Sequence, residues 1–289
     1  MIQEAPAVGS RACDILVVSG FTAAGGDVVQ FVAGIGSRVR GPLVAAGEIG
    51  TLGYLALRSL PDLVGPPFRV VGRVVARQVF FTGNQALILT GLIAFLLGEI
   101  VVIQSITRLP VLGAAGFVGD LLVIAVMREL GPLITAVIVI GRSGTAMATE
   151  LATMRLRGEV DDLDTMGIDP VLYLFLPRLA GAVISIFALI VYFDLIAVVG
   201  GYAALTLHTM TPMGTYLRTV FDALAPRDIA LVPAKALAFG SLFALVSCHM
   251  GLSVGASPTE IPRAATRAVV ASLLGIFLVD SVIAFAVYG

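Results

Sequence analysis

The chain has 289 residues, of which 58% are apolar and only 13% are charged, and its mean hydropathy is +1.02. Ordinary soluble domains carry about 25% charged residues, and a water-facing surface needs that charge. The composition therefore excludes an ordinary soluble domain and predicts an integral membrane protein. Because the 18 basic and 19 acidic residues almost cancel, the net charge does not favour nucleic acid as a partner.

Five apolar segments are long enough to cross a bilayer as helices. They are residues 86–104, 117–150, 171–205, 229–251 and 268–288. Ahead of the first, Arg69, Arg73 and Arg77 recur every fourth residue opposite a valine-rich face, which predicts an interfacial helix at about residues 61–82. We therefore expect an all-α integral membrane protein with this helix, five spans and no sizeable soluble domain.

The arginines near the span ends predict the orientation of the chain. Seven arginines precede the first span, and two follow each of the second and fourth spans, whereas the opposite loops hold only Arg108, Arg218 and Arg227. We therefore expect the N-terminus in the cytosol and the C-terminus outside. No basic segment precedes the short apolar stretch near the N-terminus, so we expect no cleaved signal peptide.

The second apolar segment, residues 117–150, is too long for a bilayer. As a helix it would run about 50 Å, against a hydrocarbon core of about 30 Å. Its inner end should therefore project into the cytosol. Gly131-Pro132 lies near its middle, and the proline removes one backbone hydrogen bond, so we expect a kink there.

Six ionisable residues fall inside the predicted spans, where charge is costly and often functional. They are Glu99, Arg128, Glu129, Asp194, Lys235 and Asp280. Lys235 and Asp280 lie at similar depth on the last two spans, which predicts a structural ion pair between adjacent helices.

Arg128 and Glu129 point about 100° apart on their helix and cannot simply neutralise each other. Asp194 lies at a similar depth, and Glu99 and Gln104 add polar groups toward the outer half of the first span. Together these residues suggest the polar lining of a pocket for an amphipathic ligand. Interhelical ion pairs without a ligand would explain them equally well.

The segment between the second and third spans predicts a short amphipathic helix at about residues 158–169. Glu159, Asp161, Asp162 and Asp164 crowd its N-terminal half, where the helix dipole favours acids. Val160, Leu163 and the pair Met166-Gly167 repeat with helical spacing, and Gly167 is a C-terminal stop, followed by Pro170. The apolar stripe needs a surface to dock against, whereas a solvated loop would not need such a stripe.

The chain has no phosphate-binding loop of the form G-x-x-x-x-G-K-[ST], because its only lysine, Lys235, stands in Pro-Ala-Lys-Ala-Leu inside a predicted span. We therefore expect no enzyme and no cofactor in this chain; any ATP must be hydrolysed by a partner. Cys13 and Cys248 lie far apart in the sequence and predict neither a disulfide framework nor a metal site.

From Arg128 onward, several stretches together carry a resemblance to one family. They are Arg-Glu-Leu-Gly-Pro at 128–132, Gly-Arg-Ser-Gly at 141–144, Glu-Leu-Ala-Thr-Met-Arg at 150–155, the acidic segment 159–170, Pro177-Arg178, Lys235, Gly251 and residues 263–270. The sequence resembles the MlaE (YrbE-type) permeases of MCE-associated lipid ABC transporters. The resemblance runs from about Arg69 to the end, so we expect a permease domain at 61–289 after a poorly matched cytosolic or interfacial segment, 1–60.

The resemblance implies a multi-pass permease of the bacterial inner membrane, paired with a second permease copy, with its C-terminus in the periplasm. In this family a cytosolic ATPase, which binds ATP and Mg, docks on a coupling helix matching Glu159–Asp169, and a periplasmic MCE-domain protein sits above. Lipid, usually phospholipid, lies between the two permeases beside residues matching Arg128 and Glu129. Gly98 and Gln104 fit the family's glycine-x5-glutamine pattern, whereas Glu99 and the missing aromatic after Gln104 depart from it.

Two other functions are compatible with parts of the sequence. Gly141-Arg142-Ser143-Gly144 satisfies G-x-S-G, and His249 ends another span at the same inner level, as an intramembrane serine protease would require. Small residues for helix packing and a histidine at the interface explain these positions as well. Paired membrane charges also serve proton-coupled secondary transporters; dependence on ATP rather than a proton gradient would separate the two kinds of transport.

Overall fold

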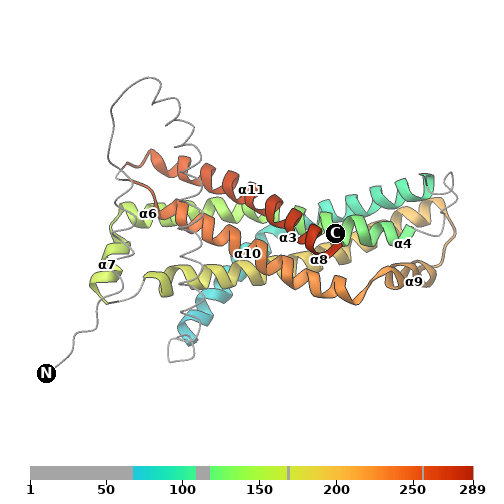
Figure 1. Ribbon diagram of the computed structural model, residues 1–289, viewed down its shortest axis with the longest axis horizontal. Helices are drawn as coiled ribbons and strands as arrows, with labels where there is room; N and C mark the ends of the chain where they lie inside the picture. The colour runs from blue at the N-terminus through green and yellow to red at the C-terminus, as the bar shows by residue number, and fades with distance from the viewer. Residues whose placement is uncertain (1–67, 109–117, 168–169, 256, 289) are drawn as a thin grey trace, which may run out of the picture.

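The computed structural model describes residues 68–108, 118–167, 170–255 and 257–288, and every regular element in these ranges is helical (Figure 1). Five helical segments are long and apolar enough to cross a membrane. They are Ala86–Arg108, Val118–Leu156, Tyr173–His208, Pro226–Leu252 and Glu260–Tyr288. The predicted all-α membrane architecture with five spans is confirmed. The predicted segment 1–60 and residues 61–67 of the interfacial helix lie outside the described residues.

The first helix, α3 (Phe68–Arg108), joins the predicted interfacial helix and the first span in one element of 41 residues. The sequence between them contains Gly83 and Asn84 but no proline. These residues weaken a helix without removing a backbone donor, so the helix continues. Of the predicted arginine face, the structure describes only the side chain of Arg77, which is exposed.

The second span is a continuous helix built from five segments. They are α4 (Val118–Leu121), the π-helix η5 (Leu122–Leu130), α5 (Gly131–Val139), the π-helix η6 (Ile140–Gly144) and α6 (Thr145–Leu156). At Gly131-Pro132, where the sequence predicts a kink, the helix changes from π-helix to α-helix, with the proline in the first turn of α5. A proline is tolerated there because its missing N–H falls where the hydrogen-bond ladder restarts.

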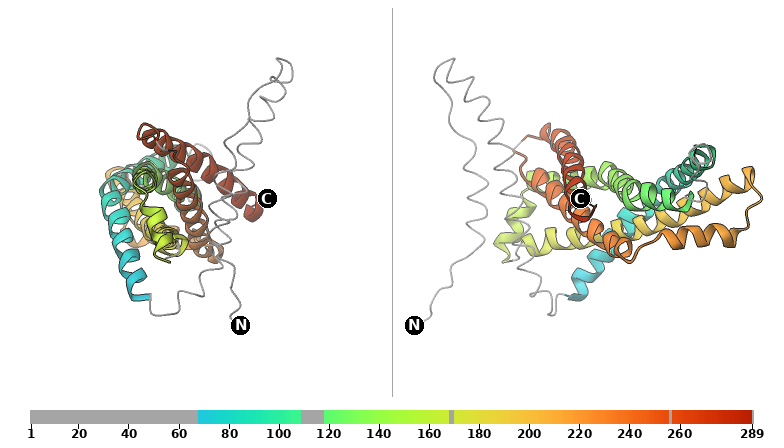
Figure 2. Two further views of the ribbon diagram at one scale, coloured as in Figure 1. Left: turned by 90° about the vertical axis from the view of Figure 1, so that its left-hand side faces the viewer. Right: turned by 45° about the vertical axis from the view of Figure 1, so that its right-hand side comes forward.

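After the second span the chain continues with α7 (Glu159–Thr165), η7 (Val171–Phe175), α8 (Leu176–His208), α9 (Met213–Ala223), α10 (Pro226–Leu252) and α11 (Glu260–Tyr288). Figure 1 shows α7 and α9 at opposite ends of the molecule, and the left view of Figure 2 shows α7 lying across the end of the bundle. Helix α11 ends short of the end of the molecule at which α9 lies (Figure 1).

Helices α3 and α8 form the most extensive contact between two elements. A side chain at Gly98 would overlap the backbone carbonyl of Ala197, and one at Gly200 would overlap that of Phe95. Small residues on facing helices let two backbones approach closely in a membrane. The glycine of the predicted pattern, Gly98, therefore serves the packing of the first span against the third.

Helix α9 was not predicted from the sequence. It is short and half polar, but Tyr216 and Val220, one turn apart, are buried beneath it. The Tyr216 hydroxyl donates to the carbonyl of Val198 at 3.1 Å. Gly201 leaves space for this hydroxyl, since a Cβ at that position would lie 2.6 Å from it. The start at Pro212 and the four-residue spacing were the available signals.

We expect the Tyr216→Phe substitution to leave the phenolate absorbance of the protein near pH ~11 unchanged. Burial raises the pKa of Tyr216 to about 12, so this phenol stays protonated when an exposed tyrosine ionises near ~10. The folded state holds this proton more tightly, so the associated stability is present below pH ~10 and is lost as pH rises toward the folded pKa. Ultraviolet titration of both proteins measures the effect; a clear drop in absorbance in the variant at that pH would contradict it.

Candidate functional site

Lys235, on α10, is the centre of a buried network of charges. Its side chain is 1% exposed. The Nζ atom donates to the backbone carbonyl of Arg128 at 2.7 Å and to Oε2 of Glu129 at 3.0 Å, and lies 2.7 Å from Oδ1 of Asp280. Lys235 and Asp280, expected as partners from their depth, are thus in contact, and Glu129 from the second span joins them. All three ammonium protons have an oxygen nearby.

The irregular second span makes the carbonyl of Arg128 available. Pro132 follows four residues later and has no N–H to donate to it. Lys235 supplies the donor from the neighbouring helix. The proline and the lysine are therefore complementary features, one freeing a backbone acceptor at membrane depth and the other satisfying it.

Arg128 points to a different partner from that of Glu129. Its Nη2 atom donates to Oδ2 of Asp228 at 2.9 Å, and the guanidinium lies 5.6 Å from the centroid of the Tyr288 ring, which Arg227 also approaches at 5.4 Å. Asp228 is not among the residues predicted from the sequence, because it precedes the apolar part of the fourth span. Asp228 is the third residue of α10 and also accepts from the Ala225 N–H at 2.9 Å, as an acid in a first helical turn does.

A pocket of about 230 Å³ lies between the second span, α8 and α10. It is lined by Met127, Arg128, Pro132, Phe187, Val191, Asp194, Leu224, Asp228, Ile229, Leu231, Val232 and Lys235. Four ionisable side chains therefore meet in a largely apolar wall. Asp194, which the depth count placed level with Arg128, lines the same pocket.

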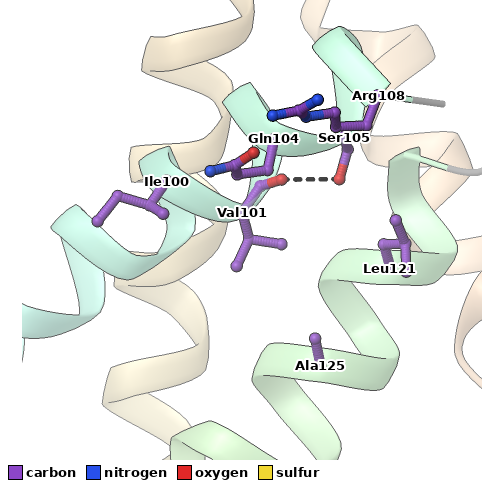
Figure 3. A pocket seen from close by; sticks show the side chains of 7 residues that line it. All are labelled: Ile100, Val101, Gln104, Ser105, Arg108, Leu121 and Ala125. Carbon is purple, nitrogen blue, oxygen red and sulfur yellow. Dashed lines mark hydrogen bonds between the residues drawn. The ribbon is translucent and has the colours of Figure 1, made fainter. Parts of the chain in front are cut away.

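A second pocket, of about 320 Å³, lies between α3 and the α4 and η5 part of the second span (Figure 3). It is lined by Ile100, Val101, Gln104, Ser105, Arg108, Leu121 and Ala125. The hydroxyl of Ser105 donates to the carbonyl of Val101 at 2.7 Å. Gln104 and Arg108 are therefore the remaining polar side chains of this pocket.

The four residues expected to line a lipid cavity are distributed differently with respect to the two pockets described here. Gln104 lines the pocket beside α3, and Arg128 lines the pocket beside α10, whereas Glu99 and Glu129 line neither.

The short acidic helix α7 forms where the sequence predicted it, with Glu159, Asp161 and Asp162 in its first turn. Gly158 and Gly167 bound it in the left-handed conformation, at φ +76° and +74°, and the Gly167 N–H donates to the carbonyl of Asp164 at 2.9 Å. Glycine adopts this conformation without strain.

The apolar stripe of α7 divides between two surroundings. Val160 and Leu163 pack on a cluster formed by Leu151, Leu174, Phe175 and Cys248, so the chain itself covers most of the stripe. Met166 is 64% exposed, and Asp161, Asp162 and Asp164 are exposed. Arg155 of α6 contacts Asp161 at 2.6 Å, which ties α7 to the C-terminal end of the second span.

Ser143 and His249, the residues of the protease hypothesis, are both buried. Neither lines either of the two pockets described above. Ser143 belongs to η6, next to Gly144, where an added Cβ would lie 3.3 Å from Oγ of Ser247 on α10. This surrounding favours the packing interpretation of the small residues.

Comparison with known proteins gives a consistent result. The family model described as "Permease MlaE" matches residues 75–286. A probable ABC transporter permease protein of Rickettsia prowazekii is 31% identical over 233 residues, which cover 81% of this chain and 89% of that protein. The chloroplastic protein TRIGALACTOSYLDIACYLGLYCEROL 1 of Arabidopsis thaliana is 31% identical over 215 residues, which cover 73% of this chain and 60% of that protein.

A probable ABC transporter permease protein of Synechocystis is 29% identical over 211 residues, which cover 73% of this chain and 80% of that protein. The matched region contains the first four spans, nearly all of the fifth, and the charge network around Lys235. The family that the sequence motifs indicated is thereby confirmed: the chain belongs to the MlaE permease family.

Proposed function

We propose that this chain is the permease subunit of an ATP-driven ABC transporter that moves phospholipid, or a similar amphipathic lipid, between the bacterial inner membrane and a periplasmic MCE-domain protein. A separate cytosolic ATPase would bind ATP and Mg, and a second permease copy would complete the cavity. The observation that carries the proposal is a network of charged residues beside a largely apolar pocket, within the spans of an MlaE-family permease.

Two features of the relatives support the two halves of the proposal. Several are named as ABC transporter permeases, which supports a partner that hydrolyses ATP. The Arabidopsis relative is named after a galactosylated diacylglycerol, which supports a lipid as cargo. The pocket fits such a cargo, since its apolar residues suit acyl chains and its charged residues suit a headgroup.

The geometry suggests how movement would reach the pocket. A partner that grips the exposed acids and Met166 of α7 would pull on α6, because Arg155 and Asp161 join these two helices at 2.6 Å. Helix α6 continues through η6 and α5 into η5, which holds Arg128 and Glu129. Motion of α7 would therefore shift the residues that bind Asp228 and Lys235.

We expect reversing the charges of Asp161 and Asp162 to lysine to reduce copurification with the ATPase and to lower ATP-dependent lipid transfer by the reconstituted complex at least about tenfold. The substitution replaces an attractive acidic face with a repulsive one, and like charges across an interface cost several kcal/mol (roughly 2–5). The measurement is the ATPase recovered with a tagged permease, together with lipid transfer with and without ATP.

Asp120 and Asp222, both changed to lysine, are the matched control, because they alter the charge equally and belong to α4 and α9. These helices lie at the opposite end of the molecule from α7 (Figure 1). An intact complex after the reversal at α7 would contradict the docking role. Transfer driven by a proton gradient without nucleotide would favour a secondary transporter, and loss of all activity in Ser143→Ala alone would favour a protease.

A further inference from the structure

Asp194, on α8, is a carboxylate whose burial the charge network does not explain. The residue is 7% exposed. Among the described residues it forms no ion pair, and its Oδ1 atom has no hydrogen-bond partner. A Cβ at Gly131 would lie 2.7 Å from Oδ1, so the glycine of the second span leaves room for this carboxylate. An unpaired acid at membrane depth is costly and points to a ligand.

The pocket of about 230 Å³ that Asp194 lines has a specific set of unused polar atoms. Oδ1 of Asp194 and Oδ1 of Asp228 are buried acceptors without a donor, and Nε of Arg128 is a buried donor without an acceptor, within the described part of the chain. Lys235 is already surrounded by three oxygens. A complementary ligand therefore brings N–H donors for the two carboxylates and one acceptor for the guanidinium.

The charges around the pocket favour a cationic group. The two cations, Arg128 and Lys235, face four carboxylates, those of Glu129, Asp194, Asp228 and Asp280. Arg227 approaches the same Tyr288 ring as Arg128, so with all seven groups ionised the balance is three positive against four negative charges. A bound ammonium would reduce this excess, whereas a headgroup with negative charge alone would increase the mismatch at Asp194.

The pocket also lies beside the ends of two spanning helices. Asp228 is in the first turn of α10, and Arg128 reaches the ring of Tyr288 at the end of α11, so two spanning helices begin or end at this level. Tyrosine is typical of the boundary between lipid and water. Phe187 and Val191 continue from Asp194 along one face of α8 and are exposed, which suits acyl chains.

We propose that this pocket binds the primary ammonium of a lipid headgroup, with Asp194 as its main acceptor, Asp228 as a second acceptor and Nε of Arg128 toward the phosphate. The proposal rests on the lipid-transport function above and assigns its headgroup chemistry: a phosphoethanolamine-type lipid is preferred over an anionic glycerol headgroup. The volume of about 230 Å³ is several times the ~30 Å³ of one water.

The test is whether the purified full-length chain discriminates between lipid headgroups. Native mass spectrometry measures binding while the chain is titrated with lipids of identical acyl chains. We expect phosphatidylethanolamine to bind about tenfold more tightly than phosphatidylglycerol, since a hydrogen bond to a charged group has an effect of this order. Asp194→Asn should abolish this ratio by weakening only phosphatidylethanolamine. Asp120→Asn, an aspartate on α4, is the matched control and should keep the ratio.

Two further measurements identify the recognised group. Dodecylamine, which has an ammonium but no phosphate, should compete with phosphatidylethanolamine in the wild-type chain and not in Asp194→Asn. Phosphatidylcholine, whose ammonium has no N–H, should bind less tightly than phosphatidylethanolamine. Should Asp194→Asn fail to give a monodisperse protein, Val191→Phe fills the pocket without changing charge and should also abolish the ratio.

Two results would overturn the proposal. Equal binding of the two headgroups by the wild-type chain, or an equal loss of both in Asp194→Asn, would rule out the ammonium site. Neither result would contradict the proposed lipid transport. If no lipid bound to the chain, both the ammonium site and the proposed lipid cargo would be ruled out.

Discussion

Lys235→Met is expected to destabilise the folded protein by about 3–5 kcal/mol, because removing one partner of a buried ionic network leaves the other charges uncompensated. The substitution removes the ammonium that lies between Glu129 and Asp280 and deprives the carbonyl of Arg128 of its donor. Methionine has a similar length and an apolar character, so the loss reflects charge and hydrogen bonding more than volume. The thermal midpoint of the detergent-purified protein and its recovery as a monodisperse species measure the effect.

The matched control is Arg218→Met, which removes an exposed positive charge on α9 and should change stability by less than ~0.5 kcal/mol. Adding Glu129→Gln and Asp280→Asn to Lys235→Met should recover part of the loss, since the carboxylates are no longer charged. A Lys235→Met protein as stable as the wild type would show that the carboxylates do not depend on the ammonium.

Gly98→Ala is expected to cost at least about 3 kcal/mol through overpacking, although it adds a single methyl group. The new Cβ would overlap the backbone carbonyl of Ala197 on α8, and a backbone cannot turn aside as a flexible side chain can. The two helices must separate along their most extensive contact, which also weakens the neighbouring contact between Gly200 and Phe95. Chemical or thermal unfolding of the purified protein measures the loss.

Gly83→Ala on the same helix is the matched control for this packing. A Cβ at Gly83 meets no atom within 4 Å, so this substitution should keep or raise stability by up to ~1 kcal/mol through helix propensity. Equal behaviour of the two variants would show that close approach of α3 and α8 is not what Gly98 provides.

Apolar length and helical rise were sufficient to predict the five spans, because each span satisfies its backbone within itself and needs no distant partner. Depth counting also placed Lys235 level with Asp280, and the stop at Gly167 followed from the local chemistry of a helix end. These features depend on residues close in sequence or on one coordinate, the distance along the membrane normal.

The contacts that depend on how the helices turn toward one another could not be predicted. From the sequence alone Asp228 resembles a loop residue. In the structure α10 places its Oδ2 atom 2.9 Å from Nη2 of Arg128. The joining of Glu129 to Lys235 depends on the π-helical turns of η5, which no propensity encodes. The division of Gln104 and Arg128 between two pockets likewise requires the packing of α3, α8 and α10.

The two π-helical stretches of the second span have a geometric consequence for the chain as a whole. A residue accommodated in a widened turn shifts the angular phase of everything beyond it by about 100° relative to an ideal α-helix. The direction in which α6 and the attached α7 face around the helix axis therefore depends on η5 and η6. It depends on them as much as on the number of residues between Arg128 and Arg155. Shortening either stretch by one residue would rotate the C-terminal end of this helix while leaving its length nearly unchanged.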